Sequence, residues 1–287
     1  MVLESILKGV DAEKQPWKVF LLGLLYSTIA IFLSLWIFKA EASLVLVFLT
    51  VLASLPLVYA TLKIEAQKGT TEKSEVKLIK SHWSGLKVFT FLFLGYVVAM
   101  SVAYILLPSG TVTDLFSSQV ATIQSINSNF ANNDVSGGLT SADFFSIIVM
   151  NNFRVLFFCI FFSFFFGAGA IFILTWNASV IAAAVGTFVR NNLASYASAV
   201  GFGKVAAYLQ YFFLGTLRYM THGIFEIGAY FVGGLAGGLI SLAILNYKVN
   251  DEKFKLLMRD AIDLVLVAMI IVVIAGLIEV WITPAIF

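Results

Sequence analysis

Residues 19–38 read VFLLGLLYSTIAIFLSLWIF, a run without a single charged side chain that decides how the chain folds. A helix needs about 20 mostly apolar residues to cross ~30 Å of hydrocarbon, and this run meets that requirement. The core of a cleavable signal peptide is shorter, about 7–15 residues, and a second apolar run follows here almost at once. We therefore expect a retained first transmembrane helix.

Similar runs recur along the chain, and the composition agrees with them. Hydrophobic residues make up 60% of the 287, charged residues make up 12%, and the mean hydropathy is +0.97. A soluble domain cannot hide that much apolar surface in one core, so lipid must surround most of it. In lipid each backbone N–H and C=O is best satisfied within its own helix, and no alternating pattern indicates a barrel. The further expected spans are 44–62, 88–107, 153–176, 224–247 and 262–282.

The segment 178–217 is harder to assign. Its two apolar stretches, 178–189 and 205–217, are each too short to span alone, and Arg190, two asparagines and two glycines lie between them. Either one broken crossing or a re-entrant pair fits this pattern. The predicted fold class is thus all-α, a polytopic transmembrane helical bundle of about seven spans with one broken or re-entrant segment.

The distribution of lysine and arginine predicts the orientation. Segments 63–87 and 248–260 are rich in basic residues, whereas 108–143 holds none. The positive-inside bias puts the first two in the cytoplasm and the third outside, with the N-terminus inside. An odd number of crossings must then lie within 178–217, which favours one broken crossing and places the C-terminus outside. The net charge of +2 gives no reason to expect nucleic acid as a partner.

Three parts of the chain can be distinguished: 1–107 with an N-terminal amphipathic helix and three spans, 108–143 as an extracytoplasmic loop, and 144–287 with four spans. Apolar residues at helical spacing in the loop predict an amphipathic helix that lies on the membrane or on the bundle. The residues of this stripe are Phe116, Val120, Ile123, Ile126 and Phe130.

Ionisable residues near the span ends are few and therefore informative. A charge is costly in lipid, so such groups generally face a partner. His222 and Glu226 are four residues apart and share a helix face, and the guanidinium of Arg154 is the expected partner of Glu226 near the outer rim. Of the two asparagines before Arg154, Asn151 and Asn152, one can cap the span and the other can join this polar network.

An alternative for His222 and Glu226 is metal binding or proton transfer. A closed zinc site needs about four ligands, and the other histidine, His82, falls in a cytoplasmic segment. A lone cysteine, Cys159, excludes an internal disulfide and a cysteine-based metal cluster. Nucleophiles such as Ser241 have no supporting pattern around them. We expect no metal, no cofactor and no enzymatic activity.

Small residues recur every four positions along the sixth expected span. In lipid such residues let helix backbones approach closely, because dispersion and interhelical hydrogen bonds replace a hydrophobic driving force. We expect this stripe to pack against the fourth span, with self-association as the alternative. The residues assigned to packing are Gly223, Ala229, Gly233, Gly237 and Ser241 on the sixth span, and Gly167 and Gly169 on the fourth.

Two motifs stand out together: Asn-Asn-Phe-Arg-Val at 151–155 with Gly-Ala-Gly at 167–169, and His-Gly-Ile-Phe-Glu at 222–226 opening a glycine-rich span. In this combination the chain resembles the stage II sporulation protein M family of integral membrane proteins. It departs from the family pattern at three positions, with Ala178 for glycine, Thr221 for proline and Ile227 for leucine. The resemblance implies a family site made of Asn151, Asn152, Arg154, Asn177, His222, Gly223 and Glu226.

The resemblance also implies a function. Sporulation members of the family have no known catalysis and anchor a peptidoglycan-degrading complex in the membrane. We therefore expect a non-enzymatic scaffold in the cell membrane that recruits membrane or extracytoplasmic proteins. The alternative is a transporter or channel for a small solute or ion, because clustered ionisable groups and broken helices are found in carriers. A homo-oligomer is compatible with the small-residue stripe.

Overall fold

A computed structural model of the chain describes residues 9–68, 79–135, 140–166, 169–193 and 202–286. Every regular element in these ranges is a helix, and seven helices are long and apolar enough to cross a membrane, which confirms the predicted fold class. The helices are α2 (Gly9–Lys14), α3 (Pro16–Ile37), α4 (Ala42–Lys68), α6 (Trp83–Leu106), α7 (Ser109–Val135), α8 (Ser141–Phe166), α9 (Ala170–Leu193), α10 (Phe202–Asn246), α11 (Glu252–Leu277) and α12 (Thr283–Ile286). A 3₁₀ turn, η1 (Lys39–Glu41), and a π-helical turn, η3 (Ile278–Ile282), complete the list.

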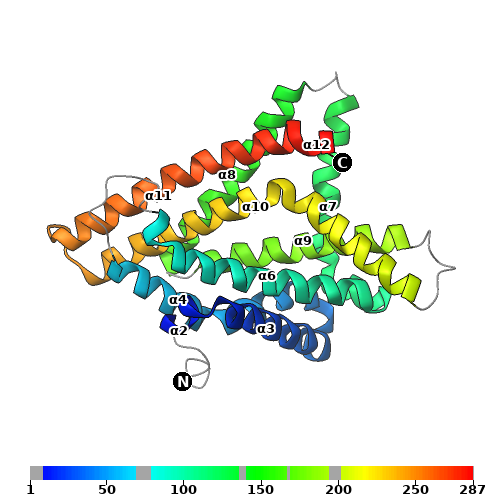
Figure 1. The fold of residues 1–287 in the computed structure, drawn as a ribbon, viewed down its shortest axis with the longest axis horizontal. Coiled ribbons are helices and arrows are strands. Elements are labelled where there is room, and N and C mark those ends of the chain that lie inside the picture. The colour runs from blue at the N-terminus through cyan, green and yellow to red at the C-terminus, as the bar shows by residue number, and fades with distance from the viewer. Residues whose placement is uncertain (1–8, 69–78, 136–139, 167–168, 194–201, 287) are drawn as a thin grey trace.

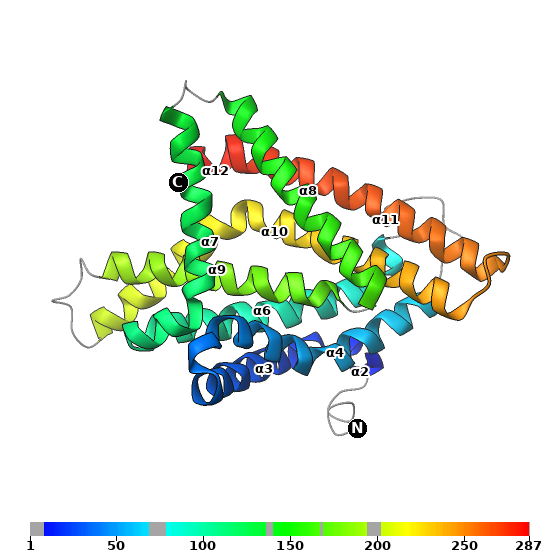
Figure 2. The same cartoon turned by 180° about the vertical axis from the view of Figure 1, so that it is seen from behind.

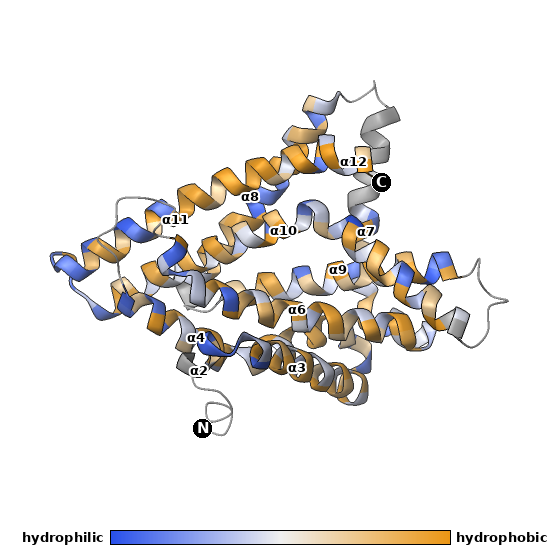
Figure 3. Ribbon diagram, viewed as in Figure 1, coloured by the Kyte–Doolittle hydropathy of each residue, from blue (hydrophilic) through white to orange (hydrophobic). Residues whose placement is uncertain are grey.

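The helices form one bundle around α10. Helices α3, α4, α6 and α9 run roughly side by side, α8 and α11 are inclined to them, and α7 crosses the bundle steeply (Figures 1 and 2). Of the apolar window of α10, 83% is buried, compared with 17% for α8. Hydrophobic residues dominate the lengths of the spans, and hydrophilic residues gather toward helix ends (Figure 3). Helix α10 is thus the core of the bundle, and most residues of α8 lie outside that core.

The structure divides the middle of the chain differently from the sequence prediction. The expected span 153–176 is two helices, because α8 ends at Phe166 and α9 begins at Ala170. A Cβ on Gly169 would collide with the carbonyl oxygen of Phe162, so glycine is required at this corner. The hydroxyl of Ser163 accepts from the backbone N–H of Ala170 at 3.1 Å. Apolar residues continue through the turn, so hydropathy alone did not reveal it.

The segment 178–217 is consequently neither a broken crossing nor a re-entrant pair. Its first part completes α9, which ends at Leu193, and its second part begins α10 at Phe202. The count of seven spans is unchanged. At ~1.5 Å per residue the 45 residues of α10 extend about 67 Å, more than twice the ~30 Å of hydrocarbon. Figure 1 shows that α10 bends near its middle, which helps this length fit the bundle.

The described parts of the two basic segments, 63–87 and 248–260, lie at the same end of the bundle. The Nζ of Lys253 donates to the backbone carbonyl of Gln67 at 3.1 Å, which joins the start of α11 to the end of α4. At the opposite end, the guanidinium of Arg190 donates to the backbone carbonyl of Leu107. Its Cζ lies 5.6 Å from the centroid of the Tyr104 ring. Arg190 therefore caps the last turn of α6.

The expected amphipathic helix of the loop is α7, and its first half lies on the bundle. Leu115 and Phe116 are fully buried. The amide of Gln119 accepts from Ser43 Oγ at 2.8 Å and donates to Ser179 Oγ at 3.1 Å, so α7 is fixed between α4 and α9. The side chains of Ile126 and Phe130 fall outside the described residues.

Small residues allow the closest helix contacts. A Cβ on Gly237 would lie 2.6 Å from the carbonyl oxygen of Ile160, so α10 meets α8 nearly backbone to backbone, and the expected contact between these spans is present. Gly167 is outside the described residues. A second close contact, not foreseen from the sequence, joins α3 to α6, where a Cβ on Gly95 would lie 2.9 Å from the Cα of Gly23.

Candidate functional site

A polar cavity of about 400 Å³ lies within the helical bundle. This volume is within the range of ~300–1,000 Å³ typical of small-molecule sites. Apolar side chains make up much of its wall, and polar groups converge on it from several helices. It is lined by Ile123 of α7; Ile147, Ile148, Asn151, Asn152 and Val155 of α8; Asn177, Val180, Ile181 and Ala184 of α9; Tyr219, His222, Gly223, Glu226, Ile227 and Tyr230 of α10; and Glu279 of η3.

Asn152 joins α8 to α10 in the wall of this cavity. Its side chain is 5% exposed. The Nδ2 of Asn152 donates to Oε1 of Glu226, and the hydroxyl of Tyr230 donates to Oδ1 of Asn152 at 2.9 Å. Glu226 and Tyr230 are four residues apart and therefore share one face of α10. The amide thus uses both of its ends to hold two side chains of the neighbouring helix.

A second carboxyl group, that of Glu279, completes the polar centre. It lies close enough to Glu226 for the two carboxyl groups to share a hydrogen bond. Nε2 of His222 is 3.9 Å from Oε1 of Glu279, and Nδ1 of His222 is 3.3 Å from Oγ1 of Thr283. The C-terminal turns η3 and α12 therefore contact α10 beside the point at which α8 contacts it.

The position of Glu279 follows from an irregular turn. Pro284 has no N–H to donate to the carbonyl four residues earlier, and its ring would clash with that group in a regular α-helix. The chain widens instead into the π turn Ile278–Ile282, in which the backbone N–H of Thr283 bonds to the carbonyl of Ile278. Single π turns are frequent at functional sites, because they displace the side chains that they carry.

The electrostatics of the cavity are unbalanced. Two carboxyl groups meet there, and no lysine or arginine is among the described residues that line it. Two carboxyl groups in contact cannot both be ionised unless a cation lies between them. Without a cation, one of the two carries a proton. Within the described ranges, His, Cys, Asp and Glu form no group of three that could hold a metal ion.

The expected ion pair between Arg154 and Glu226 is not formed. Arg154 is exposed, and Glu226 is bonded to Asn152 instead. Residues two apart on a helix point in nearly opposite directions, so only one of Asn152 and Arg154 can face α10. Burying a neutral amide costs less than burying a guanidinium, so the asparagine faces inward and the arginine faces outward.

The other residues of the predicted network lie at the cavity. Asn177 is half-buried and donates its Nδ2 to the backbone carbonyl of Ile173 at 2.8 Å, while Asn151 is exposed at the rim. Gly223, which was assigned to helix packing, has no close neighbour, since a Cβ there would meet only Met220 at 3.8 Å. Its small size therefore leaves space in the cavity.

The sequence did not single out Tyr230, because tyrosine is a common residue in transmembrane helices.

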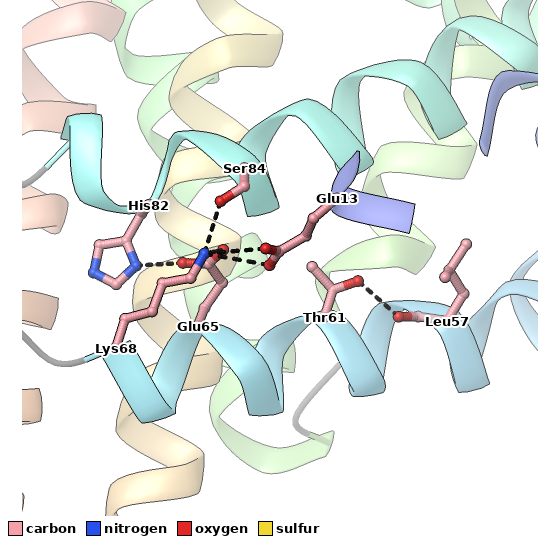
Figure 4. A network of polar contacts seen from close by, with 7 residues as sticks. All are labelled: Glu13, Leu57, Thr61, Glu65, Lys68, His82 and Ser84. Carbon is pink, nitrogen blue, oxygen red and sulfur yellow. Dashed lines mark hydrogen bonds and ion pairs between the residues drawn. The ribbon is translucent and has the colours of Figure 1, made fainter. Parts of the chain in front are cut away.

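A separate cluster of charged side chains, not foreseen from the sequence, lies at the basic end of the bundle (Figure 4). Nδ1 of His82 is 2.7 Å from Oε2 of Glu65, and both side chains are completely buried. Lys68 Nζ is 2.6 Å from Oε1 of Glu65, 3.3 Å from Oε1 of Glu13 and 2.7 Å from Ser84 Oγ. Burial raises the pKa of Glu13. The cluster connects α2, α4 and α6.

This charged cluster contributes to the packing of α6 against α4. A Cβ on Gly85 would lie 2.6 Å from Oε1 of Glu65, so glycine on α6 makes room for the carboxylate. From the sequence, Glu65, Lys68 and His82 were expected in a cytoplasmic segment because that segment is rich in lysine. The spacing of Glu65 and Lys68, three apart on one helix face, was the signal for a local ion pair.

Comparison with known proteins gives the family. The family model described as Stage II sporulation protein M matches residues 87–284. The chain belongs to the stage II sporulation protein M family. An uncharacterised protein of Methanocaldococcus jannaschii, MJ0793, is 30% identical to it over 157 residues, which cover 53% of this chain and 79% of that protein. No solved structure matches.

The region that matches the family model contains every helix that lines the cavity. Glu13, Glu65 and His82 of the charged cluster precede this region.

Proposed function

We propose that this member of the stage II sporulation protein M family is a non-enzymatic membrane protein that binds a small cationic solute in the cavity and carries it across the membrane. The observation that carries this proposal is the cavity of about 400 Å³, whose wall holds two carboxyl groups, one histidine and, among the described residues, no lysine or arginine. Intramembrane carboxyl groups are costly and usually mark a solute or proton pathway.

The composition of the wall supports a small organic ligand. Isoleucine, valine and alanine supply apolar surface, and Asn151, Asn152 and Asn177 supply amide groups that can both donate and accept. Tyr219 adds an aromatic ring, which attracts ammonium groups through its face. Apolar walls with a few convergent polar groups are typical of small-molecule sites.

The orientation belongs to the same proposal. Because the segments with most lysines lie at one end of the bundle, the positive-inside bias places that end in the cytoplasm. The N-terminus is then cytoplasmic, and α11 leads outward to an extracytoplasmic C-terminus.

Flux through purified protein tests the proposal. Uptake of labelled choline and methylammonium into proteoliposomes should exceed uptake into empty liposomes, and Glu226→Gln should reduce it at least tenfold. Glu252→Gln is the matched control, because this glutamate is 90% exposed at the start of α11. Uptake of both probes equal to that of empty liposomes would reject transport of organic cations.

A second candidate is a membrane scaffold or anchor, which is favoured by family membership, because the resemblance implies anchoring for the sporulation members. The docking surfaces would be the segments 63–87 and 108–143, with protein partners on either side of the membrane, or a second copy of the chain. Purification in mild detergent followed by mass spectrometry tests this function. Recovery of the same partner in stoichiometric amounts supports it, whereas recovery of the chain alone counts against it.

A further inference from the structure

The two carboxyl groups of the cavity come from different parts of the chain. Glu226 is on the central helix α10, whereas Glu279 is on the π turn that follows α11. Their carboxyl groups are within hydrogen-bond reach of one another. A carboxylate has no hydrogen to donate, so this contact is attractive when one of the two groups carries a proton.

Among the described residues around the pair, no lysine or arginine provides a positive charge that could replace this proton. Helix α8 contributes the neutral amide of Asn152, α9 contributes Asn177, and α7 contributes Ile123. Helix α10 contributes Tyr219, Tyr230 and His222, of which His222 is the one side chain that can become cationic. Arg154 and Arg218 are exposed and are not among the lining residues.

The hydrogen bonds already present limit what else can neutralise the pair. Asn152 directs its Nδ2 toward Glu226, while its oxygen is occupied by the hydroxyl of Tyr230. The oxygen of Asn152 is therefore already engaged and is a poor ligand for a metal ion beside the two carboxyl groups. A cation with its own N–H groups or methyl groups fits the remaining space better, because the cavity is much larger than a single ion.

We propose that the Glu226–Glu279 pair holds one proton in the empty cavity and releases it when an organic ammonium ion binds, so that the protein exchanges protons for cations. The step is balanced: one carboxyl O–H bond breaks, the proton leaves to water, and the second carboxylate charge is paired with the incoming ammonium. No covalent bond to the solute forms. This inference rests on the proposed function, because it requires that a cation enters the cavity.

The first test measures the proton without any solute. Infrared spectra of the purified protein at pH 7 should contain the carbonyl stretch of a protonated carboxyl group, and Glu226→Gln and Glu279→Gln should each remove it. Glu252→Gln should leave the band unchanged. Elution volume on size exclusion shows whether each variant is folded. A wild-type spectrum without the band, or a band that persists in both folded variants, would overturn the shared proton.

The second test measures the exchange. Choline is added to the protein in a weakly buffered solution, and a pH indicator records proton release while equilibrium dialysis records binding. We expect about one proton released for each choline bound, and no release from folded Glu279→Gln. Binding of choline without proton release would overturn the exchange and leave the proposed function standing. Failure of both choline and methylammonium to bind would overturn the proposed function together with the exchange.

Discussion

The imidazole of His82 and the carboxylate of Glu65 lie 2.7 Å apart with both side chains completely removed from solvent. The second oxygen of Glu65 accepts from Lys68 at 2.6 Å. Both oxygens of Glu65 are therefore paired at the end of α4 and the start of α6, whereas Nε2 of His82 is buried without a hydrogen-bond partner among the described residues. We expect Glu65→Gln to destabilise the protein by about 1–3 kcal/mol, because it leaves buried His82 without its carboxylate partner and Lys68 with Glu13 alone.

Chemical or thermal unfolding in detergent measures this effect. Glu252→Gln removes a carboxylate that also pairs with a lysine, Lys255 at 2.8 Å, but on the surface, and its unfolding should match wild type. Equal unfolding curves for Glu65→Gln and wild type would show that the buried cluster contributes nothing to stability.

The contact of α8 with α10 is tested at Gly237. Gly237→Ala would place a methyl group 2.6 Å from the carbonyl oxygen of Ile160 and 2.7 Å from Cβ of Ser163, so the helices must separate at a cost of about 1–3 kcal/mol. Gly228→Ala on the same helix is the matched control, because nothing lies within 4 Å of its Cβ. Its effect should be neutral or favourable, since alanine is the better helix former. Similar melting temperatures for both variants would contradict the close approach.

The bridge between helices at the cavity is tested at Asn152. Asn152→Ala leaves Glu226 and Tyr230 without their partner, and we expect a loss of about 1–3 kcal/mol in unfolding free energy. Asn151→Ala, on the exposed neighbour, should have no effect. Equal unfolding free energies of Asn152→Ala and Asn151→Ala would refute a stabilising role of Asn152 between α8 and α10.

The role of Arg154 is a separate prediction. Because this side chain is exposed and Glu226 is bonded elsewhere, Arg154→Ala should unfold at the wild-type temperature in detergent. If Arg154→Ala lowered the stability as much as Asn152→Ala, the ion pair between Arg154 and Glu226 that the sequence suggested would be present after all.

The orientation is tested by labelling cysteines in whole cells. Val249→Cys, at a residue that is 71% exposed between α10 and α11, should react with a membrane-impermeant maleimide after lysis but not before it. Thr140→Cys, exposed just before α8, should react in intact cells. The native Cys159 is buried and serves as the unreactive background. The opposite pattern would invert the proposed topology.

The sequence by itself determined the membrane class, the number of spans and several of the polar residues that line the cavity, among them Asn152, His222 and Glu226. Span number follows from hydropathy because each crossing has to cover the same thickness of hydrocarbon. His222 and Glu226 were identified together because their spacing puts them on one helix face. Asn177, which lines the same cavity, was predicted from the motifs of the family that the chain resembles.

Only the tertiary structure decided which polar groups meet. The choice of Asn152 over Arg154 as partner of Glu226 depends on how α8 is rotated against α10, and Gly237 and Ile160 set that rotation through their close contact. The corner at Gly169 was hidden because apolar residues continue through it. Long-range packing thus fixed the site, because hydropathy and helical spacing report the environment of a segment but not the rotation of one helix against another.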